Sequence, residues 1–458
     1  MNARRVPRPL SGLAVLALST GLAGCASYAS RPLPETLTWQ QPTQLRVDAR
    51  RIALPALASQ SIDLNAPLSL QGVAALAVLN DPRLQAFRGR MGVARAQAFA
   101  AGLLPDPTFS ASREVPQGYG GGATSTAYKL GLQFDLGSLI TRGAAVSAAR
   151  AHLQQVDLQL LWQEWQTAAA AERDYVKLVG LRERDALLRE QLGAASQRLR
   201  RDRAALAAGI EARTTADADL VELQSLRGQL GADVRRQAAT LGALDTVLGL
   251  RPGTPLHLAG LPRYEPAAVM DARNNLRRLT ALRPDLLALR AGYASQEQRL
   301  REAVLSQFPS VSIGFSRARD TSDVNTLGFG VTLNLPLLNG SRGAIAVQSA
   351  TRDALYDDYM LRVEQTRAQV EQLLVDIRLL RSQHKGLQSA LAPLRDATLA
   401  ADASLRLGDM TLPQAQAQRR AWLDQRMALL DNEQQTAEQT VALQLLTGSG
   451  VFRPGAPR

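Results

Sequence analysis

"TLGFGVTLNLPLLNGSRG", residues 326–343, differs from most of the chain around it. Over its first positions apolar residues alternate with small or polar ones, the apolar positions being Leu327, Phe329, Val331 and Leu333. A period of two predicts a β-strand with one apolar face and one small, polar face. The residues that follow are rich in charge, have few breakers and show helical periodicity. The chain therefore combines an amphipathic strand with a mostly helical sequence, and the strand needs an explanation.

Three other segments alternate in the same way, at residues 108–112, 126–136 and 310–316. They predict two β-hairpins, 108–136 and 310–335. Strands of this length fit a tilted transmembrane strand, although a sheet on a soluble core would alternate too. We predict that the apolar positions of 326–335 face lipid together with these positions: Tyr128, Leu130, Leu132, Phe134, Val311, Ile313 and Phe315.

Two arginines occupy matching places at the outer ends of the first and third strands, Arg113 and Arg317. A long cationic side chain at such a place can reach a membrane interface. The alternative is that they are simply two arginines close to loops.

The hairpins belong to an internal repeat with an offset of roughly 200 residues. Pro82 opens a predicted helix as Pro284 does, and Gly143 aligns with Gly343 beyond each hairpin. Further on, Gly209 aligns with Gly408. The repeat predicts these domains: a signal peptide at 1–24, an anchored extended tether at 25–70, repeat 1 at 71–250, a connecting segment at 251–270 and repeat 2 at 271–458.

Each repeat predicts one very long helix followed by a return helix. About 65 residues separate Gly143 from Gly209, which makes a helix near 100 Å long. Leucines repeat every seven residues along it at Leu178, Leu192, Leu199 and Leu206, and this heptad pattern is typical of a coiled coil. An ordinary helix bundle is the alternative. Pro393 predicts a kink or a break in the second long helix.

The N-terminus has the layout of an export signal, with a basic region, an apolar stretch and a small-residue end. The end of this stretch, "LAGC" at 22–25, resembles a bacterial lipobox. That resemblance implies that Cys25 is acylated and that the chain is anchored to the outer membrane. Cleavage at an ordinary small-residue site is the alternative.

Charge and motifs disfavour other classes of function. The formal charge of +12 falls to +9 without residues 1–24 and invites a nucleic-acid interpretation, but aromatic residues for base stacking are scarce and export makes such a partner improbable. We find no metalloprotease, phosphate-loop or nucleophile-elbow motif, so no enzyme and no cofactor are predicted. His152, His257 and His384 are scattered, so no metal site is predicted.

Four strands cannot close a membrane barrel, and an open edge in lipid leaves unsatisfied amides. Other copies must supply strands: two copies give eight strands and a filled interior, and three give twelve and room for passage. Small inward-facing residues favour three.

The sequence resembles the TolC-like outer membrane factors, the trimeric channels of bacterial efflux and type I secretion. The resemblance lies in the repeat, in the paired glycine turns and in "LPLLNGSRGAIAVQSA" at 335–350. It implies a mainly α fold with a small β part, in which a long α-helical coiled-coil barrel continues a twelve-stranded trimeric barrel. It also implies an outer membrane exit duct that works with a periplasmic adaptor and an inner-membrane transporter. "AAGLLPDPTFSAS" and "DPRLQAF" are most similar to the heavy-metal efflux branch.

The periplasmic tip departs from the family pattern. Some members close this end with aspartate rings, but the matching positions here are Gln414 and Ala417. Residues near the two glycine turns are therefore our tip or gate candidates: Gly209, Glu211, Gly408, Asp409 and Gln414. The alternative for Asp409 is a solvated turn residue. A lipid-anchored periplasmic coiled-coil scaffold without a pore is the alternative function.

Overall fold

The computed structural model describes residues 28–36, 39–117, 125–210, 212–262, 266–336 and 338–452. The predicted signal peptide, Cys25 and Glu211 lie outside the described residues. The chain divides into two compact units, residues 1–39 and 40–458. The first has no helix or strand among its described residues, and everything below concerns the second.

The helices of the second unit follow the predicted repeat. The first repeat contains α3 (Leu70–Asn80), α4 (Pro82–Gly102), α5 (Gly137–Ala207) and α6 (Arg213–Val247). The second contains α7 (Pro266–Leu276), α8 (Leu279–Leu282), α9 (Pro284–Leu305), α10 (Arg342–Leu407) and α11 (Leu412–Thr447). The long helices α5 and α10 have 71 and 66 residues, and the return helices α6 and α11 have 35 and 36. Apart from the short α8 of the second repeat, both repeats therefore contain the same helix order and nearly the same helix lengths.

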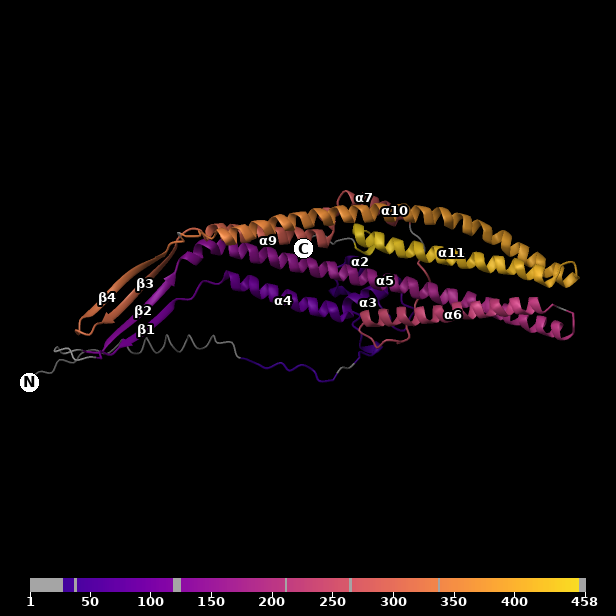
Figure 1. The fold of residues 1–458 in the computed structure, drawn as a ribbon, viewed down its shortest axis with the longest axis horizontal. Coiled ribbons are helices and arrows are strands. Elements are labelled where there is room, and N and C mark those ends of the chain that lie inside the picture. The colour runs from indigo at the N-terminus through magenta and orange to yellow at the C-terminus, as the bar shows by residue number, and fades with distance from the viewer. Residues whose placement is uncertain are drawn as a thin grey trace, which may run out of the picture. The chain divides into compact units, whose positions relative to one another are not determined.

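Proline at 393 does not end α10, which continues through it to Leu407. The expected break is therefore absent, and α10 follows a gradual curve (Figure 1). Contacts with α11 hold the helix on both sides of the proline. Gln425 Nε2 donates a hydrogen bond to the Leu387 carbonyl at 2.8 Å, and Thr398 Oγ1 donates one to the Gln418 carbonyl at 3.3 Å.

Four antiparallel strands form one sheet in the order β1-β2-β3-β4. Their bounds are β1 (Thr108–Glu114), β2 (Ala127–Asp135), β3 (Ser310–Arg319) and β4 (Asn325–Asn334). The two predicted hairpins are joined by pairing of β2 with β3, from Tyr128 opposite Arg319 to Asp135 opposite Ser312. The repeats therefore share one continuous sheet.

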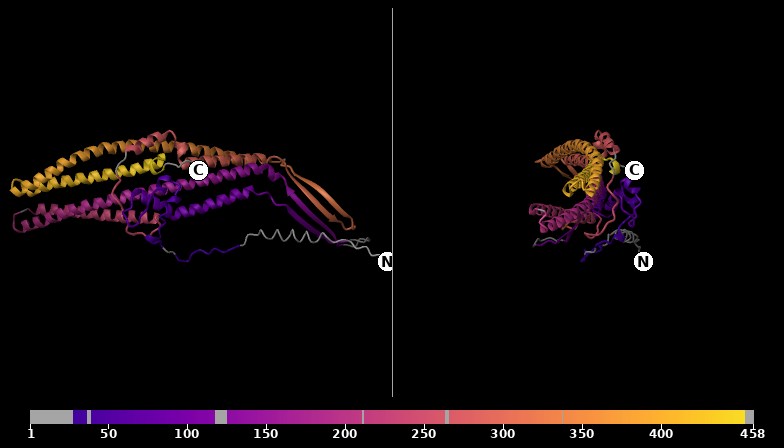
Figure 2. Two further views of the ribbon diagram at one scale, coloured as in Figure 1. Left: turned by 180° about the vertical axis from the view of Figure 1, so that it is seen from behind. Right: turned by 90° about the vertical axis from the view of Figure 1, so that its right-hand side faces the viewer.

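Within residues 40–458 the sheet lies at one end of the helices, and the turns that join α5 to α6 and α10 to α11 lie at the other end (Figures 1 and 2). None of the described helices contains a stretch long and apolar enough to cross a bilayer.

The heptad leucines of α5 are used as predicted for a coiled coil. Of the predicted leucines, Leu199 is buried and Leu192 partly buried in one cluster with Leu223 and Leu226 of α6. Such a seam buries apolar surface between two helices along their length, so the long helices do not need a globular core at this end.

The main apolar core lies around the middle of α5. Trp165, which is fully buried, contacts Phe452 from the C-terminal 3-10 turn η4 (Gly450–Phe452) with ring centroids 5.5 Å apart. The segment preceding α3, predicted as part of an extended tether, contributes buried side chains to the same region, including Leu54 and Leu57. It also forms a short parallel bridge from Leu68 to Leu258. This segment is therefore part of the core.

Candidate functional site

One face of the sheet gathers the strand residues that the sequence predicted to face lipid. Directly opposed residues of antiparallel strands share a face, so the register defines cross-strand rows. One row contains Leu132, Phe315 and Phe329, and the next contains Phe134, Ile313 and Val331. The same face continues in one direction with the row Leu130, Arg317 and Leu327, beyond which lies Tyr128. In the other direction it continues with Val311 opposite Leu333. All eleven predicted positions therefore lie on one face.

This apolar face is exposed in the single chain. Phe329 is 63% exposed, Leu327 is 87% exposed, and the rings of Phe315 and Phe329 pack on each other with centroids 5.3 Å apart. Monomeric soluble proteins rarely leave contiguous apolar patches of this kind uncovered. The face therefore needs an apolar partner outside this chain.

The opposite face of the sheet consists largely of small and polar residues. One of its rows contains Ser110, Gly131, Ser316 and Gly328. A Cβ atom added at Gly330 would meet nothing within 4 Å, so there is open space above this position. This face is therefore better suited to contact with water than to packing against an apolar core.

The sheet has two open edges, because β1 and β4 each pair with one neighbour only. An unpaired strand edge leaves a row of amide and carbonyl groups that can pair with another chain. Together with the exposed apolar face, these edges show that the sheet is incomplete in one copy.

The two glycines at the far turns have the backbone conformation for which glycine is favoured. Gly209 has φ +72° and Gly408 has φ +83°. The amide following each glycine returns to the helix: Ile210 N donates to the Ala205 carbonyl at 2.9 Å, and Asp409 N donates to the Ser404 carbonyl at 2.9 Å. The two turns are therefore the same helix-ending motif, used once in each repeat.

The other tip candidates have distinct local positions. Asp409 is exposed beside its turn. Gln414 accepts hydrogen bonds from the backbone amide of Thr411 at 3.1 Å and from its hydroxyl at 2.8 Å, so its side chain takes part in the capping box of α11.

Charged side chains connect the α5–α6 pair of the first repeat to α11 of the second. They lie along a groove of about 780 Å³ that is lined by these three helices. Arg184 of α5 donates from Nε to Asp233 of α6 and from Nη1 to Asp431 of α11, each at 2.8 Å. Further along, Glu222 lies 2.6 Å from both Arg198 and Arg420. The repeats are thus joined by one ion pair between α6 and α11, Glu222 with Arg420, and by the pair that Arg184 of α5 forms with Asp431 of α11.

The sequence reasoning did not single out these charges. Arg184 and Asp431 are far apart in the chain, and neither belongs to a short motif. Phe109 was also missed, because β1 is short and contains only one aromatic residue; it lies opposite Leu132 on the apolar face and is 69% exposed.

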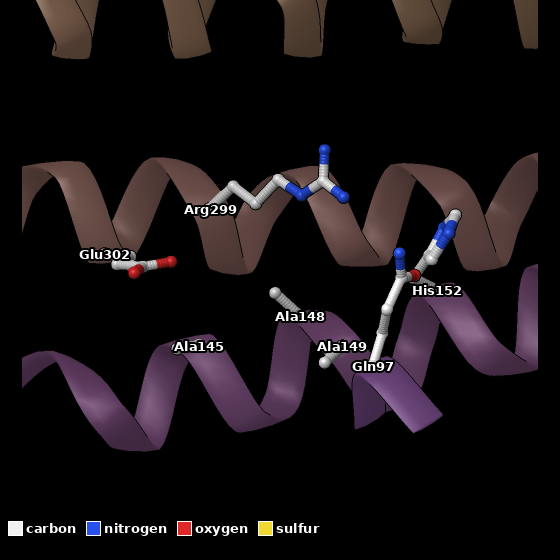
Figure 3. A pocket seen from close by; sticks show the side chains of 7 residues that line it. All are labelled: Gln97, Ala145, Ala148, Ala149, His152, Arg299 and Glu302. Atoms are coloured by element: carbon white, nitrogen blue, oxygen red, sulfur yellow. The ribbon is translucent and has the colours of Figure 1, made fainter. Parts of the chain in front are cut away.

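A small cavity lies between α4, α5 and α9, just below the sheet end of the helices. It has a volume of about 360 Å³ and is lined by Gln97, His152, Arg299, Glu302 and three alanines of α5. Figure 3 shows the carboxylate of Glu302 and the imidazole of His152 at opposite ends of this cavity. No group of three or more potential metal ligands occurs among the described residues. His384 lies elsewhere, 3.2 Å from Glu433.

The comparisons with known proteins agree with this geometry. Residues 275–449 match the model of the outer membrane efflux protein family. No curated protein sequence matches the chain.

Among solved structures, the outer-membrane channel OprN has a TM-score of 0.70 at 17% identity, with coverage of 93% of this chain and 100% of that one. CusC, whose structures concern folding and transmembrane channel formation, has a TM-score of 0.67 at 15% identity, with the same coverage. The CmeC outer membrane channel of Campylobacter jejuni has a TM-score of 0.67 at 16% identity, with coverage of 93% and 95%.

These likenesses confirm the predicted fold class, a mainly α chain with long helices and a small sheet. Through its sequence over residues 275–449 and its fold, the chain is similar to the outer membrane efflux proteins, and this confirms the resemblance to outer membrane factors indicated by the sequence.

Proposed function

We propose that this protein is the outer membrane exit duct of a tripartite efflux or type I secretion system. Three copies each contribute four strands to one closed twelve-stranded cylinder, which the helices continue into the periplasm. The observation that carries the proposal is the exposed apolar face that runs over all four strands between two open edges. Closure by further copies covers the edges, and lipid covers the apolar face.

The composition of the two faces supports a duct rather than a scaffold. A periplasmic scaffold without a pore has no use for a strand face on which phenylalanine and leucine are exposed. In the proposed twelve-stranded cylinder the small, polar face of the sheet points inward. Gly131, Gly314, Gly328 and Gly330 on this face leave space for passage. The match to the outer membrane efflux protein family supports the same function.

The duct is passive in this proposal, and the cargo is selected elsewhere. The partners are a periplasmic adaptor and an inner-membrane transporter, and the protein is anchored in the outer membrane through acylated Cys25.

Two substitutions at neighbouring positions of β4 test the orientation of the sheet. Phe329→Arg places a cation on the proposed lipid face near mid-strand, where it costs about 2–4 kcal/mol, and we expect the yield of trimer in the outer membrane to fall. Gly330→Arg places the same side chain in the open space of the other face. We expect trimer yield to be retained and single-channel conductance and cation preference to fall. The opposite pattern, or equal effects of both changes, would contradict the proposed orientation.

At the periplasmic end we propose that Asp409 narrows the opening. Threefold symmetry would repeat this exposed carboxylate into a ring. Gly209 and Gly408 shape the two turns, and Gln414 acts through the cap that it forms with Thr411. Asp409→Ala is expected to raise conductance and weaken cation preference in planar bilayers, with Asp396→Ala as the control on the exposed side of α10. Unchanged values for Asp409→Ala would remove this residue from the gate.

A further inference from the structure

Three arginines gather on the apolar face of the sheet, at the end farthest from the helices. Arg113 of β1 and Arg319 of β3 flank Tyr128 of β2 in one cross-strand row. Arg317, one row closer to the helices, lies between Leu130 and Leu327. The register therefore places all three on the face that carries the exposed leucines and phenylalanines.

The spacing lets the three side chains reach one anionic group or two adjacent ones. Neighbouring strands lie about 4.8 Å apart, so Arg113 and Arg319 are roughly 10 Å apart across β2. Arg317 is two residues from Arg319 along β3, about 7 Å away. Guanidinium groups on long flexible stems can converge over such distances, and their planar forks bind phosphate oxygens in pairs.

Among the residues that the structure describes, most of this positive charge is not neutralised. Arg319 pairs with Asp323 of the following turn. Asp320 accepts hydrogen bonds from the backbone amides of Ser322 and Val324. For Arg113 and Arg317, no ion pair with a carboxylate of the described part of the chain is formed. Glu114 follows Arg113 and so points to the opposite face of the sheet.

The opposite end of the same face has no such charge. Its rows contain Phe134, Ile313 and Val331, then Val311 and Leu333. An arginine on a lipid-facing strand is much less costly near the membrane interface than near the bilayer midplane. A cluster restricted to one end therefore marks a membrane boundary, and it requires an anionic partner there.

We infer that Arg113, Arg317 and Arg319 bind the phosphate groups of a phosphorylated glycolipid in the outer leaflet of the outer membrane. This inference rests on the proposed function, which places the apolar face in lipid and the helices in the periplasm. The acyl chains of the lipid contact the apolar rows below the arginines, and its phosphates lie against the guanidinium groups. The cluster thereby sets the depth of the sheet in the bilayer.

The test uses the full-length protein, purified in mild detergent and reconstituted in phosphatidylcholine nanodiscs containing bis-phosphorylated lipid A. Lipid that stays bound to the protein is measured by native mass spectrometry. For the unaltered protein we expect roughly tenfold weaker retention of dephosphorylated lipid A, because each arginine near an anionic surface contributes on the order of 1 kcal/mol. Added inorganic phosphate is expected not to displace the lipid. Equal retention of the two lipids, or displacement by inorganic phosphate, would overturn the inference.

Variants locate the site. Arg113→Gln combined with Arg317→Gln is expected to weaken lipid A retention roughly tenfold. The matched control is Lys129→Gln, because Lys129 lies next to Tyr128 on β2 and points to the opposite face. Equal loss in the control, or no loss in the double variant, would overturn the inference.

Trimer mass and single-channel conductance are measured on every sample, including the double variant, so that a folding defect is recognised. If the double variant does not assemble, the comparison of the two lipids on the unaltered protein decides the inference. A conducting trimer that retains both lipids equally contradicts the lipid site alone. A protein that forms no trimer contradicts the proposed function and the inference together.

Discussion

Two buried carboxyl groups in the helical part have pKa shifts of opposite sign, and their surroundings explain the difference. Glu172 of α5 is 1% exposed, and its Oε2 has no hydrogen-bond partner among the described residues. Burial raises the pKa of Glu172 to about 8. Burial also acts on Asp285, but hydrogen bonds and charge from Arg283 and Arg362 outweigh it and lower the pKa of Asp285 below its usual value. One carboxyl is therefore neutral at pH 7, and the other is ionised.

Glu172→Gln is predicted to make the protein less sensitive to alkaline pH. The pKa of Glu172 is raised in the folded state, so below its ordinary pKa near 4.5 the group is neutral in both states and does not reduce the free energy of unfolding. The free energy of unfolding then falls as pH rises from about 4.5 toward 8. Above pH 8 the ionised group costs roughly 5 kcal/mol, which the amide avoids. Thermal unfolding in detergent at pH 5 and pH 9 is the measurement. The variant should gain stability over wild type only at pH 9.

Glu371→Gln is the matched control, since Glu371 is exposed on α10 and pairs with Arg367. It should shift the unfolding midpoint little at either pH. A Glu172→Gln variant that is no more stable than wild type at pH 9 would show that Glu172 is solvated and titrates normally.

Asp285→Asn is predicted to destabilise the fold strongly. The guanidinium of Arg283 is fully buried and is held by both oxygens of Asp285, at 2.8 and 2.6 Å. Removing one charge of a buried pair typically costs about 3–5 kcal/mol because the other charge stays unpaired. The lowered pKa of Asp285 gives stability that is present above its ordinary pKa near 3.8 and is lost as pH falls through the folded-state value. The difference between variant and wild type, measured by thermal unfolding, should therefore shrink toward acid pH.

Asp396→Asn is the control for this pair, because Arg395 and Asp396 are both more than half exposed. Exposed pairs contribute little. Equal effects of Asp285→Asn and Asp396→Asn would mean that the buried pair does not stabilise the fold.

At the scale of elements, the long helices end where glycine permits a left-handed residue. Gly408 closes α10 with φ +83°, and a Cβ atom there would meet nothing within 4 Å. Space is therefore available, and only the backbone conformation disfavours another residue.

Gly408→Ala is predicted to loosen the turn between α10 and α11, at a cost of about 1–2 kcal/mol for a left-handed alanine. Hydrogen exchange of the Asp409 amide, which bonds to the Ser404 carbonyl, should speed up. Gly386→Ala, within α10 and equally uncrowded, should instead stabilise the helix by about 0.5–1 kcal/mol. Slower exchange at Asp409 after Gly408→Ala would contradict this account of the turn.

Elements with strong local patterns could be predicted from the sequence, and those decided by distant contacts could not. Alternation located all four strands, and glycine located the turn at Gly408. The pairing of β2 with β3 depends on residues almost 200 positions apart, so no local pattern reveals it. Proline at 393 was expected to kink or break α10, but the helix continues through it. Hydrogen bonds between α10 and α11, made by Gln425 and by Thr398, support the helix before and after the proline.

The same limit applies to the candidate site. The apolar face follows from period two alone, which is why its eleven residues could be named in advance. The bridge from Arg184 to Asp233 and Asp431 was missed because charged residues are common on helices and their partners lie in other elements.

At the scale of the whole molecule, one chain leaves its sheet unfinished. Backbone groups along β1 and β4 lack a partner strand, and the apolar face is uncovered. In lipid each unsatisfied backbone group costs several kcal/mol, so the proposed function requires that other copies close the sheet.

Disulfide trapping between β1 and β4 tests this closure most directly. Cysteine at Ser112 or Ser110 of β1 is combined with cysteine at Thr326 or Thr332 of β4, with the single-cysteine variants as controls. Within one chain β1 and β4 are separated by two strands, about 14 Å, which exceeds the reach of a disulfide. If three copies share one cylinder, at least one pair will form cross-linked dimers and a closed trimer in membranes, and no larger species. Absence of cross-links in every pair, together with a monomeric mass in mild detergent, would contradict the shared cylinder.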